Sequence, residues 1–314
     1  MINKKYLTGV ILCAGKATRL KNLPFNKPKS LLEIAGRPII EYQLSYFKKV
    51  GIKKVIIVVG KNGKHLKKYI KLKNKFKLNV KFVRDLSPKG IGSSLWKIKK
   101  YIRGSMILFL GDIFLYKPNL KKMISTYRKE KCSCVIASIK EKDINKIRKN
   151  FTVHIKKNSI VEKVIEKPQN PTNRIKGVGA YIFSYDIFNA ISETSKSLKK
   201  SKELGITESI QKLIDLKKKV INSLCVEYDY NINEPIDLWK INFHILKKNK
   251  QKNYISKNNI NFKNVEISNS IIGENVSIAS DSKISNSIIF SNTNLRKKIL
   301  INNKIVINSS SLKI

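Results

Sequence analysis

Residues 11–34, ILCAGKATRLKNLPFNKPKSLLEI, contain the stretch that decides the fold. An apolar run breaks into a loop of small residues at Gly15, and a series of cations follows closely. A glycine at the end of a strand lets backbone N–H groups approach a ligand, and nearby cations attract negative charge. This combination predicts a phosphate-rich ligand. The cations are Arg19, Lys21, Lys27 and Lys29.

Two periodicities alternate outward from this stretch, over the first two thirds of the chain. Short apolar runs rich in β-branched residues are typical of buried strands, and segments with apolar residues at helical spacing lie between them. This alternation predicts an α/β fold, with a Rossmann-like, mostly parallel sheet covered by helices. The predicted strands include residues 7–15, 53–60, 78–85, 105–112 and 132–139, and the predicted helices include 38–51, 93–102 and 119–130.

The ends of the predicted strands carry the first candidate site residues. Gly15, Gly60 and Asp112 each follow an apolar run. Ligands of parallel sheets bind beyond the carboxyl ends of the strands, so we expect these three residues at one edge of the sheet. Gly51 ends the first predicted helix in the manner of a C-cap.

The character of the sequence changes from about residue 256. Helical periodicity gives way to short segments rich in Ile, Val, Ser and Asn, and ISNSIIGENVSI at 267–278 is repeated as ISNSIIFSNTNL at 284–295. A repeat of seventeen residues predicts a β-helix, in which each rung buries its apolar positions on the next. A pair of small β-hairpins is the alternative. We therefore expect an α/β domain over 1–250 and a short β-helix domain over 256–314.

The chain of 314 residues has a formal net charge of +44. A basic surface for nucleic acid or an anionic membrane is one explanation. The other is a codon bias, because the cations are mostly Lys, and Lys, Asn and Ile, which are abundant together, all have A/T-rich codons. The lysines are scattered and Arg is scarce, which favours the bias. We therefore expect no specific nucleic-acid partner and no membrane partner.

Cysteine spacing and hydropathy indicate a reduced, cytoplasmic protein. None of the four cysteines forms a C-x-x-C pair or has a histidine at ligand spacing. No run of eighteen apolar residues occurs, and the apolar start of the chain reaches Gly15 too soon for a signal peptide, so it is interpreted as a first strand.

The motif AGKATR matches neither the P-loop nor the dinucleotide-binding G-x-G-x-x-G pattern. The longer string A-G-x-[GA]-[TS]-R-L, then P-K, then IAGRPIIEY, resembles the sugar-1-phosphate nucleotidyltransferases. Further motifs follow in the order of that family, and together they are most similar to the glucose-1-phosphate thymidylyltransferase branch. The C-terminal repeat resembles the short left-handed β-helix, of hexapeptide type, that many members carry. The further motifs are GIGSSLWKIKKYI, LFLGDIF, VIEKPQNP, GVGAYIFSYDIF, ELGITESIQKLID and YNINEPIDL.

The resemblance implies a nucleotide site near the N-terminus. Arg19 would clamp the departing phosphates and Lys29 would contact the phosphates during transfer. For each cation alone, a solvated surface charge is the alternative. The implied nucleotide-binding residues are Leu12, Ala14, Gly15, Lys16, Ala17, Thr18, Gly90 and Gly92.

The resemblance also implies Mg²⁺ as cofactor. Asp112 ends an apolar segment, where a carboxylate is costly to bury unless it binds something. The second ligand falls on Asn231, where many relatives have Asp, and Asp229 is the alternative. Apart from the motif, Asp112 could be a turn or helix-cap residue.

For the acceptor, the resemblance implies that Glu166 binds a sugar hydroxyl and Lys167 the sugar phosphate, with Gly179 beside them. A surface ion pair before a proline turn is the alternative for Glu166 and Lys167. The chain departs from the family pattern at Ala17, Thr152 and Gly177, and the resemblance implies that these changes touch the sugar pocket.

These residues imply transfer of a nucleotidyl group from a nucleoside triphosphate to a sugar 1-phosphate, with dTTP and glucose 1-phosphate as the expected pair. UTP, GTP or CTP with another acceptor is an alternative, as is a regulatory subunit that senses nucleotide sugars without turnover. Acyl transfer by the repeat is excluded because His65, His154 and His244 all precede it. The open ends of a short β-helix predict a homo-oligomer.

Overall fold

The computed structural model describes residues 7–15, 23, 25, 27–73, 76–198, 202–259, 262–308 and 310–314. The chain divides into two compact units. The first unit joins residues 1–15 to 43–229, and the second joins 16–42 to 230–314. The second unit thus combines an N-terminal segment with the C-terminal repeat, a division that differs from the 1–250 and 256–314 expected from the sequence.

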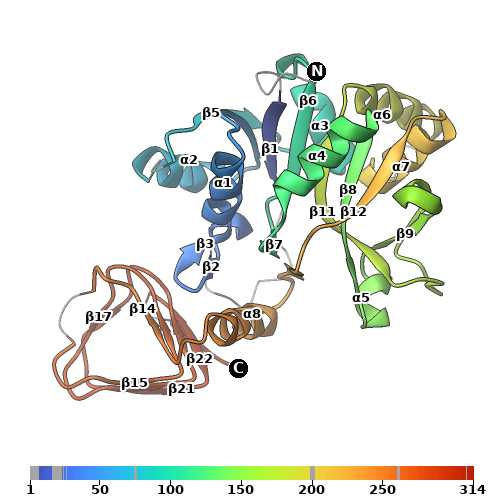
Figure 1. The fold of residues 1–314 in the computed structure, drawn as a ribbon. Helices are drawn as coiled ribbons and strands as arrows, with labels where there is room; N and C mark the ends of the chain where they lie inside the picture. The colour runs from blue at the N-terminus through green and yellow to red at the C-terminus, as the bar shows by residue number, and fades with distance from the viewer. Residues whose placement is uncertain are drawn as a thin grey trace. The chain divides into compact units, whose positions relative to one another are not determined.

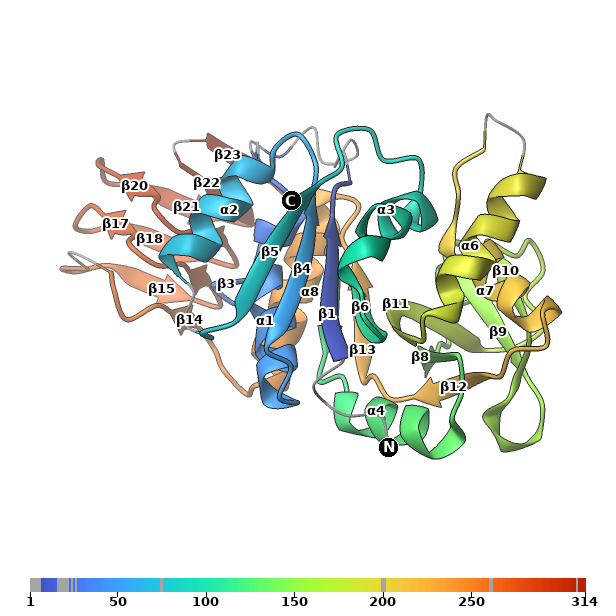
Figure 2. The ribbon, with the colours of Figure 1, turned by 90° about the horizontal axis from the view of Figure 1, so that it is seen from above.

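The first unit is built on a large sheet whose parallel half contains the N-terminal strand. Four strands pair side by side in the order β6-β1-β4-β5, all parallel, as Figure 2 shows. They coincide with four predicted strands. Their bounds are β1 Leu7–Cys13, β4 Lys54–Val59, β5 Asn79–Arg84 and β6 Ser105–Leu110.

The other half of the sheet corrects the expectation of a mostly parallel arrangement. Strand β11 pairs antiparallel with β6, β8 and β9, and β9 pairs antiparallel with β10; only β12 and β8 are parallel. Only the short helix α5 (Ile144–Arg148) and a 3₁₀ turn at Lys157–Ser159 separate β8, β9 and β10, too little chain for parallel crossovers. The bounds are β8 Cys134–Lys140, β9 Phe151–Ile155, β10 Val161–Glu166, β11 Ile175–Phe183 and β12 Val220–Leu224.

Helices cover both faces of this sheet. On one face, α3, α6 and α7 pack into a core that includes Val10 of β1 and Tyr181 of β11. On the other face, Phe47 of α1 packs against Gly9 and stacks on Phe109, with ring centroids 4.9 Å apart. The bounds are α1 Ile39–Lys49, α2 Gly63–Leu72, α3 Ile91–Ile98, α4 Leu120–Glu130, α6 Asp186–Ser197 and α7 Ile206–Asp215; β7 spans Ile113–Tyr116, β13 Tyr228–Asn231, and a 3₁₀ turn Lys99–Tyr101 extends α3.

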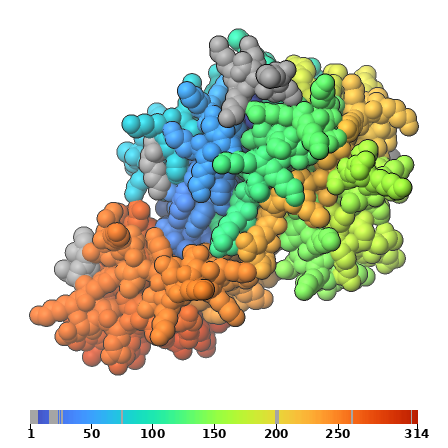
Figure 3. All heavy atoms as spheres, in the orientation of Figure 1, coloured from blue at the N-terminus to red at the C-terminus, as the bar shows by residue number. Residues whose placement is uncertain are grey.

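Parallel strands stack in register along the C-terminal repeat. Ile271 pairs with Ile288 and Ile288 with Ile305, while Ile267, Ile284 and Ile301 align in the same way on another face. Their side chains fill a dedicated apolar core. Residues after 260 therefore form the rungs of a β-helix, which is drawn in orange to red in Figures 1 and 3. The bounds are β14 Tyr254–Ile255, β15 Glu266–Ser268, β16 Ile271–Ile272, β17 Ser277–Ile278, β18 Lys283–Ser285, β19 Ile288–Ile289, β20 Asn294–Leu295, β21 Leu300–Asn302, β22 Lys304–Ile307 and β23 Ser310–Lys313.

Asparagine residues form the corners of the β-helix. Asn269, Asn286 and Asn303 lie one rung apart with φ between 42° and 51°. Asn tolerates this left-handed conformation better than other residues with a Cβ atom. Asn269 Nδ2 donates to Asn286 Oδ1 at 2.7 Å, which links consecutive rungs. The Asn-rich composition therefore has a structural role in the repeat.

The state of the cysteines and the character of the helices bear on the expected compartment and on membrane contact. The four cysteines are all free thiols. Among the described residues, no helix combines the length and the apolar character needed to cross a bilayer.

We predict that Asn286→Ala lowers the thermal midpoint of unfolding more than Asn286→Gly does, by the equivalent of about 1 kcal/mol. Both variants lose the amide that links the rungs, but only alanine places a Cβ atom in a left-handed conformation. Differential scanning calorimetry measures the difference, with Asn294→Ala on the exposed face of β20 as control. Equal midpoints for the two Asn286 variants would show that the corner conformation carries no strain.

Candidate active site

The carboxyl ends of the parallel strands in the first unit bring the predicted loops together. Gly15 follows β1, Gly60 follows β4 and Asp112 follows β6. The N–H of Gly111 donates to the carbonyl of Leu12 at 2.9 Å, so the turn that carries Asp112 touches the end of β1. A Cβ atom on Gly111 would lie 2.5 Å from Cys13 Sγ and 2.7 Å from Leu12 O, which explains why this position has no side chain.

The predicted nucleotide residues at this edge are only partly described. Leu12 lies in β1, and Ala14 and Gly15 follow it directly. Lys16, Ala17, Thr18 and Arg19 lie outside the described residues, so their predicted roles in phosphate binding stay predictions.

Gln43 holds the Asp112 turn, and the sequence analysis missed it. Its Nε2 donates to Leu110 O at 2.8 Å and to Ile113 O at 3.2 Å, on either side of Gly111 and Asp112. Gln43 is 2% exposed and lies on α1. A polar residue on the apolar face of a helix was the available signal, because such a residue needs buried partners.

Gly90 and Gly92 have a packing role that is independent of any nucleobase. Gly90 precedes α3 with φ 100°, and a Cβ atom there would lie 2.4 Å from Leu204 O. The N–H of Gly92 donates to the same carbonyl at 2.8 Å, and the N–H of Leu204 donates to Lys89 O at 2.8 Å. The loop before α3 is thus bonded to the segment before α7.

The predicted acceptor residues lie at the end of β10. Thr207 Oγ1, on α7, donates to Glu166 Oε2 at 2.8 Å. Desolvation raises the pKa of Glu166, and the bond from Thr207 opposes that shift. Lys167 adopts φ 43°, and its N–H donates to Asn150 O at 2.6 Å. The EKP motif is therefore a fixed turn whose carboxylate is oriented by Thr207.

Strand β11 carries the remaining acceptor positions. Gly179, with φ 70°, packs against Leu110 and Ile113, the residues that flank the Asp112 turn. Gly177 faces the ring of Phe151, and Thr152 is fully buried, with its hydroxyl bonded to Asn173 Oδ1 at 2.8 Å. The two departures from the family pattern thus have structural partners within the sheet.

In the second unit, two predicted site residues lie next to each other. Lys29 Nζ donates to Ile232 O at 2.8 Å, beside Asn231. The side-chain oxygen of Asn231 is buried, and nothing in the described part of the chain donates a hydrogen bond to it. A predicted phosphate-binding cation therefore bonds the residue that follows a predicted metal ligand in the sequence.

Asp237 fixes the loop that follows Asn231, and the sequence analysis missed its role. Helix α8, Pro235–Lys248, begins with a capping box between Glu234 and Asp237. Asp237 Oδ2 accepts from the N–H groups of Asn233 and Glu234, both at 2.9 Å. The spacing Glu-Pro-x-Asp was the signal, since it matches a helix start.

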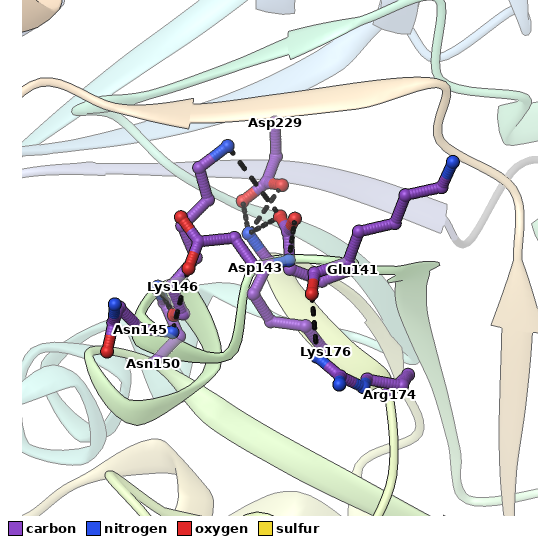
Figure 4. A network of polar contacts seen from close by, with 9 residues as sticks. Glu141, Asp143, Asn145, Lys146, Asn150, Arg174, Lys176 and Asp229 are labelled. Carbon is purple, nitrogen blue, oxygen red and sulfur yellow. Dashed lines mark hydrogen bonds and ion pairs between the residues drawn. The ribbon is translucent and has the colours of Figure 1, made fainter.

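Asp229, the alternative metal ligand, already has a partner in the first unit. Lys176 Nζ, at 2% side-chain exposure, bonds Asp229 Oδ1 at 2.8 Å and Oδ2 at 3.0 Å, and lies 3.3 Å from Glu141 Oε2 (Figure 4). Burial raises the pKa of Asp229, and Lys176 opposes that shift. Of the two candidates, Asn231 is thus the one whose side-chain oxygen accepts no hydrogen bond within the part of the chain that the structure describes.

The donor chemistry of the predicted metal ligands fits Mg²⁺, which prefers carboxylate, amide and water oxygens. Asp112 belongs to the first unit and Asn231 to the second. Within the described residues, no three His, Cys, Asp or Glu side chains cluster as a metal site. Mg²⁺ commonly keeps few protein ligands, because waters and substrate phosphates supply the others.

The sequence profile of the family described as Nucleotidyl transferase matches residues 8–247. This chain belongs to that family. The resemblance to the sugar-1-phosphate nucleotidyltransferases is thereby confirmed.

Three curated relatives are similar to this chain, and two of them are named for different nucleotides. The chain is 32% identical over 257 residues to the bifunctional protein GlmU of Methanococcus aeolicus, a match covering 80% of this chain and 58% of that protein. It is 29% identical to a D-glycero-alpha-D-manno-heptose 1-phosphate guanylyltransferase of Campylobacter jejuni (58% of this chain, 78% of that protein) and 24% identical to a glucose-1-phosphate thymidylyltransferase of Streptomyces griseus (76% and 66%). The chain thus spans little more than half of the GlmU relative.

A solved structure supports the fold. A UDP-glucose pyrophosphorylase complexed with UDP-glucose superposes with a TM-score of 0.68 at 22% identity, over 77% of this chain and 98% of that one. The likeness confirms the α/β architecture of the transferase part.

We predict that Gln43→Met destabilises the protein by about 2 kcal/mol, because two buried carbonyls lose their donor while the side-chain volume is kept. Thermal unfolding measures the effect. The control is Gln169→Met, on an exposed loop. A Gln43 variant as stable as the control would mean that the Asp112 turn holds its shape without the amide.

Proposed function

We propose that this chain transfers a nucleotidyl group from a nucleoside triphosphate to a sugar 1-phosphate, forming an NDP-sugar and pyrophosphate. The observation that carries the proposal is the bond from Lys29 Nζ to Ile232 O, next in sequence to Asn231, whose buried side-chain oxygen accepts no hydrogen bond from the described residues. An ammonium group and a neutral oxygen ligand on adjoining segments suit a polyphosphate that arrives with a divalent cation.

The reaction requires positioning and neutralisation of charge more than covalent help. Asp112 and Asn231 would hold Mg²⁺, which supplies charge neutralisation at the phosphate oxygens when bound. Lys29 would donate to the phosphates, together with Arg19. Leu12, Ala14, Gly15, Lys16, Ala17 and Thr18, with Gly90 and Gly92, would surround the nucleotide.

Glu166, Lys167 and Gly179 would bind the acceptor. Thr207 keeps one oxygen of Glu166 occupied, which leaves the other to orient toward a sugar hydroxyl. Lys167 would pair with the sugar phosphate. We propose dTTP and glucose 1-phosphate as substrates, with UTP, GTP or CTP and another phosphorylated acceptor as the alternative.

The test is pyrophosphate release with Mg²⁺, with dTTP, UTP, GTP and CTP each offered alongside glucose 1-phosphate and then a panel of other sugar 1-phosphates. We expect release with one triphosphate, and a loss of about 100-fold or more in Asp112→Asn because a charged ligand is removed. Asp215→Asn, at the exposed end of α7, is the matched control. Triphosphate binding without release for every acceptor would contradict the proposal in favour of a regulatory subunit.

We propose further that the β-helix is left-handed, that the chain works in the cytoplasm, and that it forms a homo-oligomer through the β-helix. Strand β21 ends one face of the β-helix in the described residues, and Leu300 on it is 70% exposed. An uncovered edge of this kind favours pairing with another subunit. We expect sedimentation at micromolar protein to give a mass above that of one chain, and Leu300→Lys to lower it. A monomeric mass for the unaltered chain would contradict oligomer formation.

A further inference from the structure

The hairpin that follows Lys29 is docked on the β-helix. Strands β2 (Glu33–Ile34) and β3 (Arg37–Pro38) pair antiparallel, four residues after Lys29. Glu33 Oε2 accepts from the N–H of Ser291 at 3.2 Å and from its hydroxyl at 2.9 Å. Both residues belong to the second unit. The β-helix is therefore in direct polar contact with the segment that carries a predicted phosphate-binding residue.

The sequence of the repeat differs between successive rungs at the position where the hairpin docks. Successive rungs carry Gly273 then Phe290, and Glu274 then Ser291, at matching positions of an otherwise similar sequence. A Cβ atom on Gly273 would lie 2.5 Å from Ser291 N and 2.9 Å from Glu33 Oε2. The missing side chain thus leaves room for the carboxylate, and the serine supplies its two donors.

Aromatic contact strengthens the same junction. Phe290 packs edge-on against Phe25, with ring centroids 5.9 Å apart, just before Lys29 in the sequence. At the tip of the hairpin, Gly36 lies against the ring of Tyr254 on β14. The β-helix therefore contacts the chain on both sides of Lys29.

Helix α8 holds the backbone of the hairpin. Asn242 is fully buried; its Oδ1 accepts from the N–H of Ala35 at 2.7 Å, and its Nδ2 donates to Glu33 O at 3.1 Å. Lys29 itself bonds the loop that leads into α8, through Ile232 O. The segment from Lys29 to the hairpin is thus fixed at several points to α8 and the β-helix.

We propose that Glu33 and Ser291 lock the Lys29 segment to the β-helix, which makes Glu33 a positioning residue for the triphosphate contact of Lys29. The role of Lys29 in this statement rests on the proposed function. The β-helix then serves the transferase reaction within its own chain, in addition to any contact between subunits.

The environment of Glu33 makes the stability that this group contributes depend on pH. Desolvation raises the pKa of Glu33 to about 7, while the bonds from Ser291 and the charge of Lys27 oppose the rise and Glu274 adds to it. The pKa lies above the value of 4.5 for a free side chain, so the folded chain holds one more proton between those two pH values. Stability from this group is therefore highest at low pH and is lost as the pH rises toward 7.

The first test compares Ser291→Ala and Glu33→Gln with the unaltered chain. Hydrogen exchange of amides 29–38 should rise several-fold in Ser291→Ala, and triphosphate affinity by calorimetry should fall about tenfold with acceptor affinity unchanged. Matched controls on the exposed face of β15 are Ser268→Ala and Glu266→Gln. Glu33→Gln keeps an acceptor oxygen, so it should perturb exchange less than Ser291→Ala.

The second test is the pH profile of thermal stability. The thermal midpoint of Glu33→Gln minus that of the unaltered chain should increase by about 5 °C from pH 5 to pH 8. The reason is that glutamine does not titrate, so the variant does not lose this stability as the pH rises. Glu266→Gln should show no such gain.

Each outcome bears on one of the two proposals. Unchanged exchange at 29–38 in Ser291→Ala, or unchanged triphosphate affinity in a chain that binds triphosphate, would overturn the lock. A chain that binds no triphosphate at all would contradict the proposed function, and the exchange data would still decide whether the lock exists.

Discussion

The bond from Gly111 N–H to Leu12 O, at 2.9 Å, is the contact on which the candidate site depends. It joins the turn after β6 to the end of β1, the strand at the centre of the parallel half of the sheet. The approach is possible only because position 111 has no side chain. Gln43 then brackets the same turn from α1, so Asp112 projects from backbone that is fixed from two directions.

Rigid backbone at this edge has a chemical consequence. Nucleotidyl transfer gains most of its rate from charges held in place before the substrate arrives. Loops after strands of a buried sheet supply such fixed positions, and the capping box of Asp237 gives the loop after Asn231 the same property in the second unit. Each unit thus holds its predicted site residue by a different local device, a glycine contact in the first unit and a helix cap in the second.

The β-helix does more than repeat a regular pattern of rungs. Its corners are stabilised by Asn residues in left-handed conformations, and its rungs by stacked Ile. At one corner the pattern is broken by Gly273 and Ser291, and Glu33 occupies that break. This part of the β-helix surface is a docking site for the β2–β3 hairpin, and residues 16–42 and 230–314 together form one compact unit.

The sequence by itself determined the alternation of strands and helices, the family, and the β-helix, because these depend on periodicity and on motifs that lie within short windows. It also placed Gly15, Gly60 and Asp112 after strands, since apolar runs end where buried strands end. Only the tertiary structure decided that half the sheet is antiparallel, that Gln43 holds the Asp112 turn, and that Lys176 engages Asp229. It alone joined Glu33 to Ser291, which are 258 residues apart in the sequence. Contacts of that kind arise from how packed elements meet, and no local pattern in either segment encodes the other.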